Sequence, residues 1–334
     1  MEMKKYNSID LCKFVMAFCV IAIHTRPLYY STSEIAIGLL DSVVSMAVPF
    51  FFLASGFLLA KKMNNPLCGE GNDVVIIKYL KRILKLYLLW EIIYFPWSVI
   101  HFHSLRMPIF QSLISYLQGL ILVGELYNSW HLWYLLSTVY ALLFILLEIK
   151  RKRSDFRILM TGCIFLLISV GVSYIGSMNE VGNTGVLYYI KMLIANTIRS
   201  GRVLLGLFYI PVGMYLSKKK IDLKLSWVLF IVGFGANYLV ADSRLSTLCV
   251  GVSAIGLFSV VESIEFADRP FFPFVRKMST IIYFIHMYVW SVYYVLVYRK
   301  QHYGMDSFIV TSVACLVIAA AYLWLKDIYT RAKR

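Results

Sequence analysis

Residues 42–60 read SVVSMAVPFFFLASGFLLA, a stretch of nineteen positions without an ionisable side chain. A helix needs about 20 predominantly apolar residues to cross the hydrocarbon core of a bilayer, so the apolar run over 35–60 predicts a membrane crossing. Nine other apolar runs of spanning length occur, at 9–28, 80–100, 131–149, 157–176, 201–217, 225–241, 245–261, 280–298 and 308–327. The sequence therefore predicts an all-α, polytopic membrane protein of about ten transmembrane helices.

The composition is typical of a chain that lies mostly in the membrane. Of 334 residues, 60% are hydrophobic and 15% are charged, whereas soluble domains are about half apolar and a quarter charged. Ten crossings of about 20 residues leave too little chain for a separate soluble catalytic domain, so we expect residues 1–334 to form a single integral membrane domain. The run 111–124 is too short to span and is expected to lie in the interface or to re-enter the membrane.

The net charge is +15, from 33 Lys and Arg against 18 Asp and Glu, which in a soluble chain would indicate nucleic-acid binding. In a membrane protein, basic residues instead gather in cytoplasmic loops. With the N-terminus inside, 24 of them fall on the cytoplasmic side and eight on the outer side. This bias predicts that both termini are cytoplasmic. It also explains the positive net charge by the orientation of the chain in the lipid bilayer, so no nucleic-acid partner is expected. The six cysteines form no CxxC pair, so no metal site is expected.

The first predicted helix carries three ionisable residues, Asp10, Lys13 and His24. Insertion of an ionisable side chain at the bilayer centre costs about 2.5–3.5 kcal/mol on insertion scales, so each of the three residues is expected to have a structural or functional role. Lys13 and His24 are eleven residues apart, which places them on one helix face and about 16 Å apart along it. Asp10 and Lys13 have the spacing of an ion pair. His24 either makes an interhelical hydrogen bond or has a chemical function.

Five strings of sequence occur in the order of a known family. They are Lys13 followed after ten residues by His24, PFFFLASGFLL at 49–59, YLKRILKLY at 79–87, WHLWYL at 130–135 and IIYFIH at 281–286. Together they resemble the acyltransferase-3 family of integral membrane acyltransferases, over nearly the whole chain. The family's usual residue at the position of Lys13 is arginine. Lysine keeps the positive charge but lacks the planar guanidinium that can make two parallel hydrogen bonds to one anion.

The resemblance implies a ten-helix bundle of the cytoplasmic membrane. Such an enzyme takes an acyl group, commonly acetyl from acetyl-CoA in the cytoplasm, and transfers it to a hydroxyl of an envelope glycan or a similar acceptor. Acyl-CoA would be the co-substrate, and a homo-oligomer is left open. The strings are also similar to the membrane part of vancomycin-resistance serine racemases. The alternative function is therefore a transporter domain for serine or another small amino acid.

The resemblance also implies that His24 is central to catalysis. Histidine has an unperturbed pKa of about 6.5 and suits a general base that activates a hydroxyl, or it could hold the acyl group itself. Asp10 is about 21 Å away along the helix, so a carboxylate partner must come from elsewhere, and Glu91 is the intramembrane candidate, with a structural hydrogen bond as its alternative. Lys13 completes the predicted catalytic set. Ser55-Gly56 is expected to serve close helix packing rather than to supply a nucleophile.

The predicted donor-binding residues lie toward the cytoplasm. Lys81, Arg82 and Lys85 stand where the third helix enters the membrane and could bind the phosphates of coenzyme A, or they form an ordinary positive-inside flank. His286, about 10 Å into the predicted helix 280–298, either contacts the donor or packs between helices.

The predicted acceptor-binding residues lie toward the outside, near the depth of His24. Trp130, His131 and Trp133 open the fourth helix, where they could stack on a sugar or anchor the helix at the interface. Arg199 and Arg202 could meet an anionic acceptor or snorkel to the outer surface.

Overall fold

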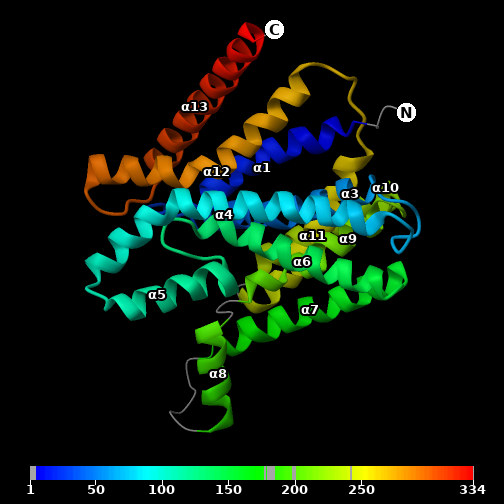
Figure 1. The fold of residues 1–334 in the computed structure, drawn as a ribbon, viewed down its shortest axis with the longest axis horizontal. Coiled ribbons are helices and arrows are strands. Elements are labelled where there is room, and N and C mark those ends of the chain that lie inside the picture. Colours follow the sequence, from blue (N-terminus) through cyan, green and yellow to red (C-terminus); the bar gives the residue numbers. More distant parts are fainter. Residues whose placement is uncertain (1–4, 177, 179–184, 198–200, 241–242, 334) are drawn as a thin grey trace. The chain divides into compact units, whose positions relative to one another are not determined.

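The computed structural model of the protein describes residues 5–176, 178, 185–197, 201–240 and 243–333. Over this part of the chain every regular element is a helix (Figure 1), which confirms the predicted all-α polytopic architecture. The α-helices are α1 (Asn7–Thr25), α2 (Glu34–Ser45), α3 (Ala47–Ala60), α4 (Asn72–Ser104), α5 (Ile109–Gln118), α6 (Trp133–Lys150), α7 (Asp155–Gly176), α8 (Val186–Thr197), α9 (Gly206–Leu216), α10 (Leu223–Leu239), α11 (Ser243–Ser263), α12 (Phe271–Tyr298) and α13 (Met305–Ala332). Three short segments join them, the π-helix η1 (Gly119–Val123) and the 3-10 helices η2 (Trp130–Leu132) and η3 (Arg202–Leu204).

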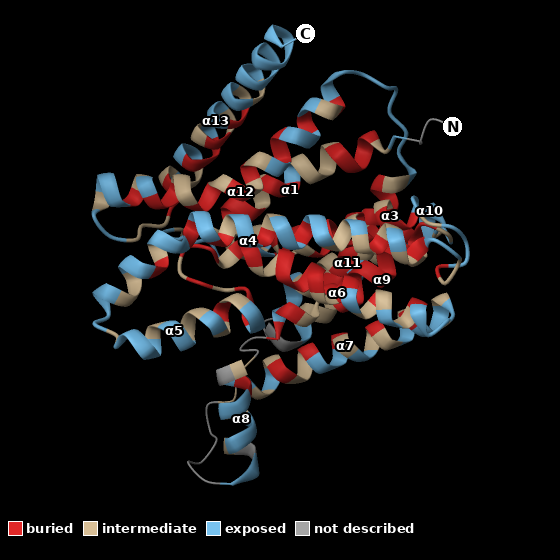
Figure 2. Cartoon of the chain, viewed as in Figure 1, coloured by how far each residue is buried: buried red, intermediate tan, exposed pale blue. Residues whose placement is uncertain are grey.

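All ten predicted crossings coincide with helices. Eight helices in the described residues are long and apolar enough to cross a membrane. The predicted crossings 201–217 and 225–241 correspond to shorter apolar stretches, Arg202–Leu216 and Leu223–Leu239. Every residue of α9 except Tyr215 is buried, as the red ribbon of Figure 2 shows, so α9 is a short central helix rather than a lipid-facing one.

The predicted crossing 35–60 consists of two helices, α2 and α3, that are separated at Met46. Pro49 explains the break, because a proline lacks an N–H and its ring clashes with the carbonyl four residues earlier, which belongs to Ser45. Ser33 caps the start of α2, since its hydroxyl accepts a hydrogen bond from the N–H of Ala36 at 3.3 Å.

Two helices begin earlier than the hydropathy pattern predicts. α4 begins at Asn72 instead of 80, and α12 begins at Phe271 instead of 280. The 33 residues of α4 extend over about 50 Å, whereas the hydrocarbon core is about 30 Å thick. The early turns carry lysines and arginines that reach for water, and hydropathy therefore does not count them as part of a crossing.

The chain divides into two compact units, which are considered one at a time. Unit 1 comprises Met1–Phe50, Asp222–Ala241 and Cys249–Arg334, and unit 2 comprises Phe51–Ile221 and Asp242–Leu248. In unit 1, α12 packs along both α1 and α13, and α2 packs against α1 and α10 (Figure 1). The pairing of α1 with α12 brings their side chains together.

In unit 2, α9 packs against α3, α6 and α7. Two glycines let α3 and α9 approach backbone to backbone. A Cβ atom on Gly56 would overlap the carbonyl oxygen of Ile210, and one on Gly213 would overlap the carbonyl oxygen of Leu53. Small residues at such crossings allow the close packing on which membrane helices depend. Gly56 therefore has the packing role that the sequence predicted.

The run 111–124 forms the end of α5 and the π-helix η1, and it folds back beside α4 (Figure 1). The hydroxyl of Tyr87, in the middle of α4, donates a hydrogen bond to the carbonyl oxygen of Leu120 at 2.7 Å. The hydroxyl of Tyr140 in α6 donates to the carbonyl oxygen of Ile121. Irregular backbone is tolerated at membrane depth only where protein satisfies it, and these two tyrosines do so. The two hydrogen bonds hold the run against α4 and α6, and its placement in the interface or within the membrane stays a prediction.

A polar loop closes one end of unit 2, between α3 and α4. The side-chain amide of Asn72 donates to three carbonyl oxygens within the stretch 64–67, at 2.9 to 3.2 Å. Asp155, the first residue of α7, accepts a hydrogen bond from the N–H of Leu67 at 3.0 Å and forms an ion pair with Lys218 at 2.8 Å. These contacts place the starts of α4 and α7 and the end of α9 at the same end of the unit.

A labelling experiment tests which end of unit 2 faces the cytoplasm. The charge bias predicts that exposed Lys219 is inside and that exposed Ser104, at the far end of α4, is outside. From Asn72 to Ser104, α4 is about 48 Å long. In a background without the six native cysteines, we expect Ser104→Cys to react with an impermeant thiol reagent in intact cells. Lys219→Cys should react only after permeabilisation. Reaction of Lys219→Cys in sealed cells would reverse the predicted topology.

Candidate active site

Two histidines of α1 and α12 lie side by side in unit 1. The ring centroid of His24, in the last turn of α1, is 5.4 Å from that of His286 in α12, and the ring planes are tilted by 34°. His286 is 1% exposed, whereas His24 is only partly buried. His24 is therefore the accessible member of the pair, and His286 lies behind it.

The hydrogen bonds of His286 define its tautomer. Its Nδ1 atom lies 2.8 Å from the carbonyl oxygen of Tyr283 and 3.2 Å from that of Ile282. Because a carbonyl oxygen only accepts, Nδ1 carries the hydrogen, and in the neutral ring Nε2 carries the lone pair. The backbone of α12 thereby fixes the orientation of the imidazole that faces His24, as a second hydrogen bond does for functional histidines.

The position of His286 along its helix differs from the prediction. Because α12 begins at Phe271, His286 lies about 22 Å along the helix rather than about 10 Å. Its ring lies beside His24, at the end of α1 opposite to Asn7. The predicted helix began nine residues too late because hydropathy missed the first turns of α12, and the depth of His286 in the membrane stays a prediction. Donor binding by His286 stays a prediction.

Asp10 has a partner on another helix. Its Oδ2 atom lies 3.4 Å from Nη1 of Arg276 in α12, and the Asp10 residue is 6% exposed. The spacing of Asp10 and Lys13 did not indicate this contact between helices. Lys13 is partly exposed one turn further along α1, on the face that also carries His24. Its catalytic role stays a prediction.

An aromatic and charged cluster beside the end of α1 was not predicted. The N–H of Gly304 donates to the carbonyl oxygen of Thr25 at 2.9 Å, and this bond ties the turn before α13 to α1. The guanidinium of Arg26 lies 5.2 Å from the ring centre of Tyr303, which is 5.2 Å from the ring of Tyr29. A cation and aromatic rings therefore lie just beyond the end of α1 that carries His24.

Asp306 joins several side chains of this cluster. It accepts hydrogen bonds from the hydroxyls of Tyr293 at 2.9 Å and Tyr298 at 2.8 Å, and it lies 3.2 Å from Nε2 of His302. Tyrosines are common at membrane interfaces, so the sequence alone did not distinguish Tyr293 and Tyr298 as members of a cluster. The turn before α13 brings Asp306 to them. Within the described residues, no group of three or more His, Cys, Asp or Glu side chains is placed to hold a metal ion.

Glu91 belongs to unit 2, where it lies on a buried polar face of α4. Glu91, Tyr94 and Ser98 are spaced by three and four residues, so they share one helix face, and each is at most 2% exposed. The hydroxyl of Ser129 donates to Oε2 of Glu91 at 3.4 Å. This contact fits the structural alternative for Glu91. Its role as a partner of His24, which lies in unit 1, stays a prediction.

The predicted acceptor residues before α6 are largely packed within unit 2. His131 is 2% exposed, and its ring centroid is 5.2 Å from that of Tyr94. Trp133 is half-buried and lies 5.9 Å from the ring of Phe52, and Trp130 is half-buried as well. The two tryptophans are therefore only partly available to a ligand.

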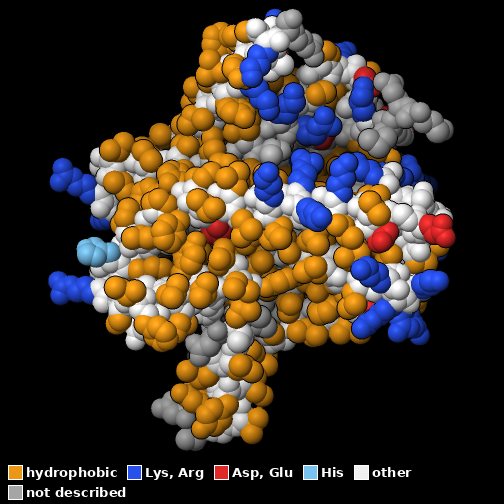
Figure 3. All heavy atoms as spheres, in the orientation of Figure 1, with side chains coloured by type: hydrophobic (Ala, Val, Ile, Leu, Met, Phe, Trp, Pro, Cys, Tyr) orange, Lys and Arg blue, Asp and Glu red, His pale blue; other side chains and the backbone are white. Residues whose placement is uncertain are grey.

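The remaining predicted binding residues are basic. Lys81, Arg82 and Lys85 are exposed on α4, and Figure 3 shows blue side chains over this part of α4 within a mostly apolar surface. Arg202, at the start of η3, is also exposed, whereas Arg199 lies outside the described residues. Lys81 and Lys85, at i and i+4, share a face, so the cations on α4 form a group that an anion can meet.

Comparison with known proteins places these features in a family. The family model described as "Acyltransferase domain" matches residues 6–325. This range includes every residue of the predicted catalytic, donor and acceptor sets. No solved structure matches the chain.

Three curated relatives carry racemase names. An "Amino-acid racemase" of Enterococcus faecalis is 29% identical over 234 residues, which is 68% of this chain and 32% of the relative. A second protein of that name and organism is 26% identical over 64% of this chain and 28% of its own length. A "Serine/alanine racemase" of Enterococcus gallinarum is 27% identical over 45% of this chain and 21% of its own length. The chain thus spans about a third or less of these relatives.

Proposed function

The chain belongs to the acyltransferase-3 family, and we propose that it is an O-acyltransferase of the cytoplasmic membrane. The proposed enzyme moves an acyl group, acetyl in the simplest case, from cytoplasmic acyl-CoA to a hydroxyl of an envelope glycan or similar acceptor. The observation that carries this proposal is the pairing of partly exposed His24 with buried His286. A hydroxyl is a poor nucleophile until its proton is removed, and histidine is suited to remove it near neutral pH.

In the proposed reaction, His24 takes the proton of the acceptor hydroxyl while the oxygen attacks the carbonyl carbon of the thioester. A C–O bond forms and the C–S bond breaks. The thiolate of CoA leaves and receives the proton from His24, so the products are an ester and free CoA. General-base catalysis of this kind contributes typically about 10²–10⁴-fold to the rate. His286, whose ring is fixed by its own helix, acts as a positioning residue that orients His24.

The donor part of the proposal is supported by the exposed cations of α4. Lys81, Arg82 and Lys85 lie in the half of α4 that the charge bias assigns to the cytoplasm, where acyl-CoA is found. Phosphates bind such cations through charge-assisted hydrogen bonds. Lys13, on the face of α1 that carries His24, would add a positive charge along the path of the donor.

A triple substitution tests these cations. Changing Lys81, Arg82 and Lys85 to glutamine should raise the KM for acetyl-CoA about tenfold, because charged hydrogen bonds to phosphate are lost, and should leave kcat largely unchanged. Lys219→Gln, which removes one exposed cation from the same end of unit 2, is the control. An unchanged KM together with an altered topology would assign the three cations to membrane orientation alone.

The acceptor part is supported by the residues that follow His24 at the end of α1. Tyr29 is 52% exposed and Tyr30 is 70% exposed, and Arg26 offers a cation beside them. Aromatic rings with a polar tip suit a ligand that has both apolar faces and hydroxyls. Trp130, His131, Trp133, Arg199 and Arg202 remain proposed acceptor contacts.

The proposal is tested with purified protein, acetyl-CoA and an envelope extract from the host cell. We expect CoA thiol to be released only when the extract is present, and acetyl label to appear in the extract. A protein that releases no thiol and transfers no label with any extract fraction would refute the proposed function.

The racemase names of the relatives favour one rival, a domain that transports serine or another small amino acid. Proteoliposomes that contain the chain distinguish the two functions. Uptake of labelled serine without acyl transfer would support the rival. Acyl transfer without uptake, the result we expect, would support the enzyme.

A further inference from the structure

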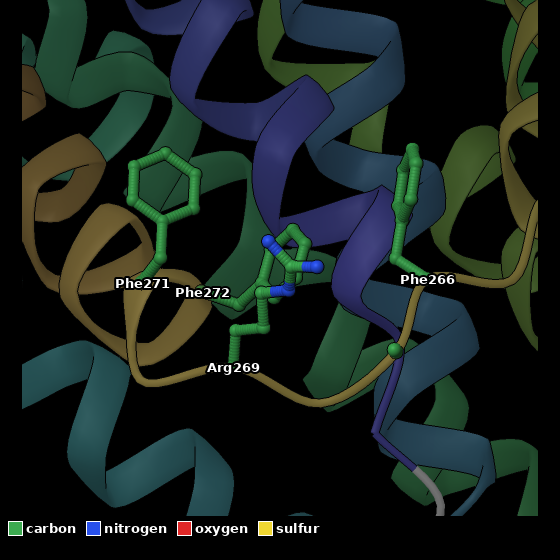
Figure 4. Close-up of a pocket in the computed structure, with 5 residues that line it drawn as sticks. Phe266, Arg269, Phe271 and Phe272 are labelled. Carbon is green, nitrogen blue, oxygen red and sulfur yellow. The ribbon is translucent and has the colours of Figure 1, made fainter.

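A pocket opens in unit 1 where the loop 264–270 leads into α12 (Figure 4). It measures about 390 Å³ and is lined by Phe266, Ala267, Arg269, Phe271 and Phe272. Phe272 is buried, with its ring centroid 5.7 Å from that of Phe266 and 5.6 Å from that of Phe271. The outer rings are 45% and 53% exposed, so aromatic faces are available to a ligand.

The loop is tied to the start of α1. The side-chain amide of Asn7 donates to the carbonyl oxygen of Phe266 at 3.2 Å and to Oδ1 of Asp268 at 2.8 Å. Lys5 forms an ion pair with Oδ2 of Asp268 at 3.0 Å. These hydrogen bonds, that of Asn7 foremost, hold the pKa of the Asp268 carboxyl below its ordinary value, so the carboxylate stays charged at neutral pH. The wall of the pocket is therefore held in place.

The pocket also offers a site for negative charge. Arg269 is exposed, and its side chain forms no ion pair or hydrogen bond with any residue that the structure describes. Figure 4 shows it projecting between Phe266 and Phe271. The adjoining first turn of α12 carries no acidic residue that would repel an anion. Aromatic faces and an arginine fork thus meet in one place.

We propose that this pocket holds the nucleotide end of the acyl donor, with the adenine base on the faces of Phe266 and Phe271 and phosphate on Arg269. This assignment rests on the proposed function. Bases stack on aromatic side chains through their flat π-faces, and the guanidinium fork matches the geometry of phosphate oxygens.

The position of the pocket fits the shape of acyl-CoA. Asn7 and His24 are seventeen residues apart on α1, which is about 25 Å along the helix axis. In acyl-CoA a long flexible chain separates the nucleotide from the thioester. A nucleotide bound at the Asn7 end of α1 can therefore direct its thioester along α1, past Lys13, toward His24.

Two donors separate this pocket from the rest of the donor path. Acetyl-CoA carries the nucleotide, and S-acetylpantetheine lacks it. The double variant Phe266→Leu, Arg269→Gln should raise the KM for acetyl-CoA at least about tenfold and leave the KM for S-acetylpantetheine unchanged. The control is the double variant Phe274→Leu, Lys277→Gln, which changes two exposed side chains of α12 outside the pocket and should behave as wild type. Equal shifts for both donors, or none, would overturn the assignment.

Direct binding of CoA, measured by calorimetry on the purified protein, keeps this test independent of turnover. One outcome is that wild type binds CoA, that the pocket variant does not bind it, and that wild type transfers no acyl group. This outcome would support the pocket and refute the proposed function. If acyl transfer occurs but the variant binds CoA normally, the pocket fails and the proposed function stands. Weaker binding in Arg269→Gln but not in Phe266→Leu would indicate an anion site, such as one for a lipid headgroup, and would overturn the nucleotide assignment.

Discussion

His24→Ala should lower the rate of acyl transfer at least about 100-fold, which is the lower end of what a general base contributes. Expression should stay near normal, because His24 is only partly buried and alanine is cheaper to place in a membrane than an imidazole. His24→Gln keeps hydrogen bonding without a base and should be equally inactive. The measurement is the initial rate of CoA release at matched amounts of folded protein.

Substitutions of His286 and Lys13 provide comparisons for the His24 variants. His286→Gln should lower kcat and change its pH dependence while leaving KM unchanged, because His286 acts by orienting His24. Lys13→Arg should be tolerated, since arginine is usual in the family, and Lys13→Ala should lose less activity than His24→Ala, because Lys13 lies about 16 Å away. Full activity in His24→Gln would mean that the histidine only packs, and the transporter function would then be favoured.

Gly213→Ala should destabilise the protein by about 3 kcal/mol, the upper part of the usual range for overpacking. Its new Cβ would overlap the carbonyl oxygen of Leu53, a backbone atom of α3 that cannot rotate aside as a side chain can. Gly56→Ala should act in the same way through Ile210 on α9. Thermal unfolding in detergent and the monodisperse fraction on size exclusion report the loss.

Gly171→Ala is the matched control for these substitutions. Gly171 also lies within a helix of unit 2, but nothing approaches within 4 Å of the position of its Cβ. Alanine is favoured over glycine in a helix by about 0.5–1 kcal/mol, so this variant should be as stable as wild type or slightly more so. If Gly213→Ala were as stable as Gly171→Ala, the close approach of α3 and α9 would be contradicted.

The helices were predictable because a membrane leaves few choices. Backbone that crosses lipid must satisfy its own hydrogen bonds, so apolar length alone located all ten runs as helices. The packing role of Gly56 was also predictable, since a small residue in an apolar helix has few other uses. The break before Pro49 was not predicted, although its cause is one proline ring.

Contacts between distant residues were not predictable from such patterns. Arg276 of α12 binds Asp10 of α1, and the turn before α13 brings Asp306 to Tyr293 and Tyr298. The spacing of these residues in the sequence does not indicate either set of contacts. The early start of α12 was missed because its first turns carry the basic residues Arg276 and Lys277, which lower the hydropathy there. The hydrogen bonds that tie the run 111–124 to Tyr87 and Tyr140 were likewise not predictable from the sequence.

Transfer across a sealed membrane tests the central claim most directly. Right-side-out vesicles that contain the protein are loaded with acetyl-labelled acetyl-CoA, and the envelope extract is supplied only outside. Wild type should place label on the external acceptor and leave free CoA inside, while His24→Gln should place none. Label on the acceptor at equal rates in both proteins, or in neither, would contradict an acyltransferase that works through His24.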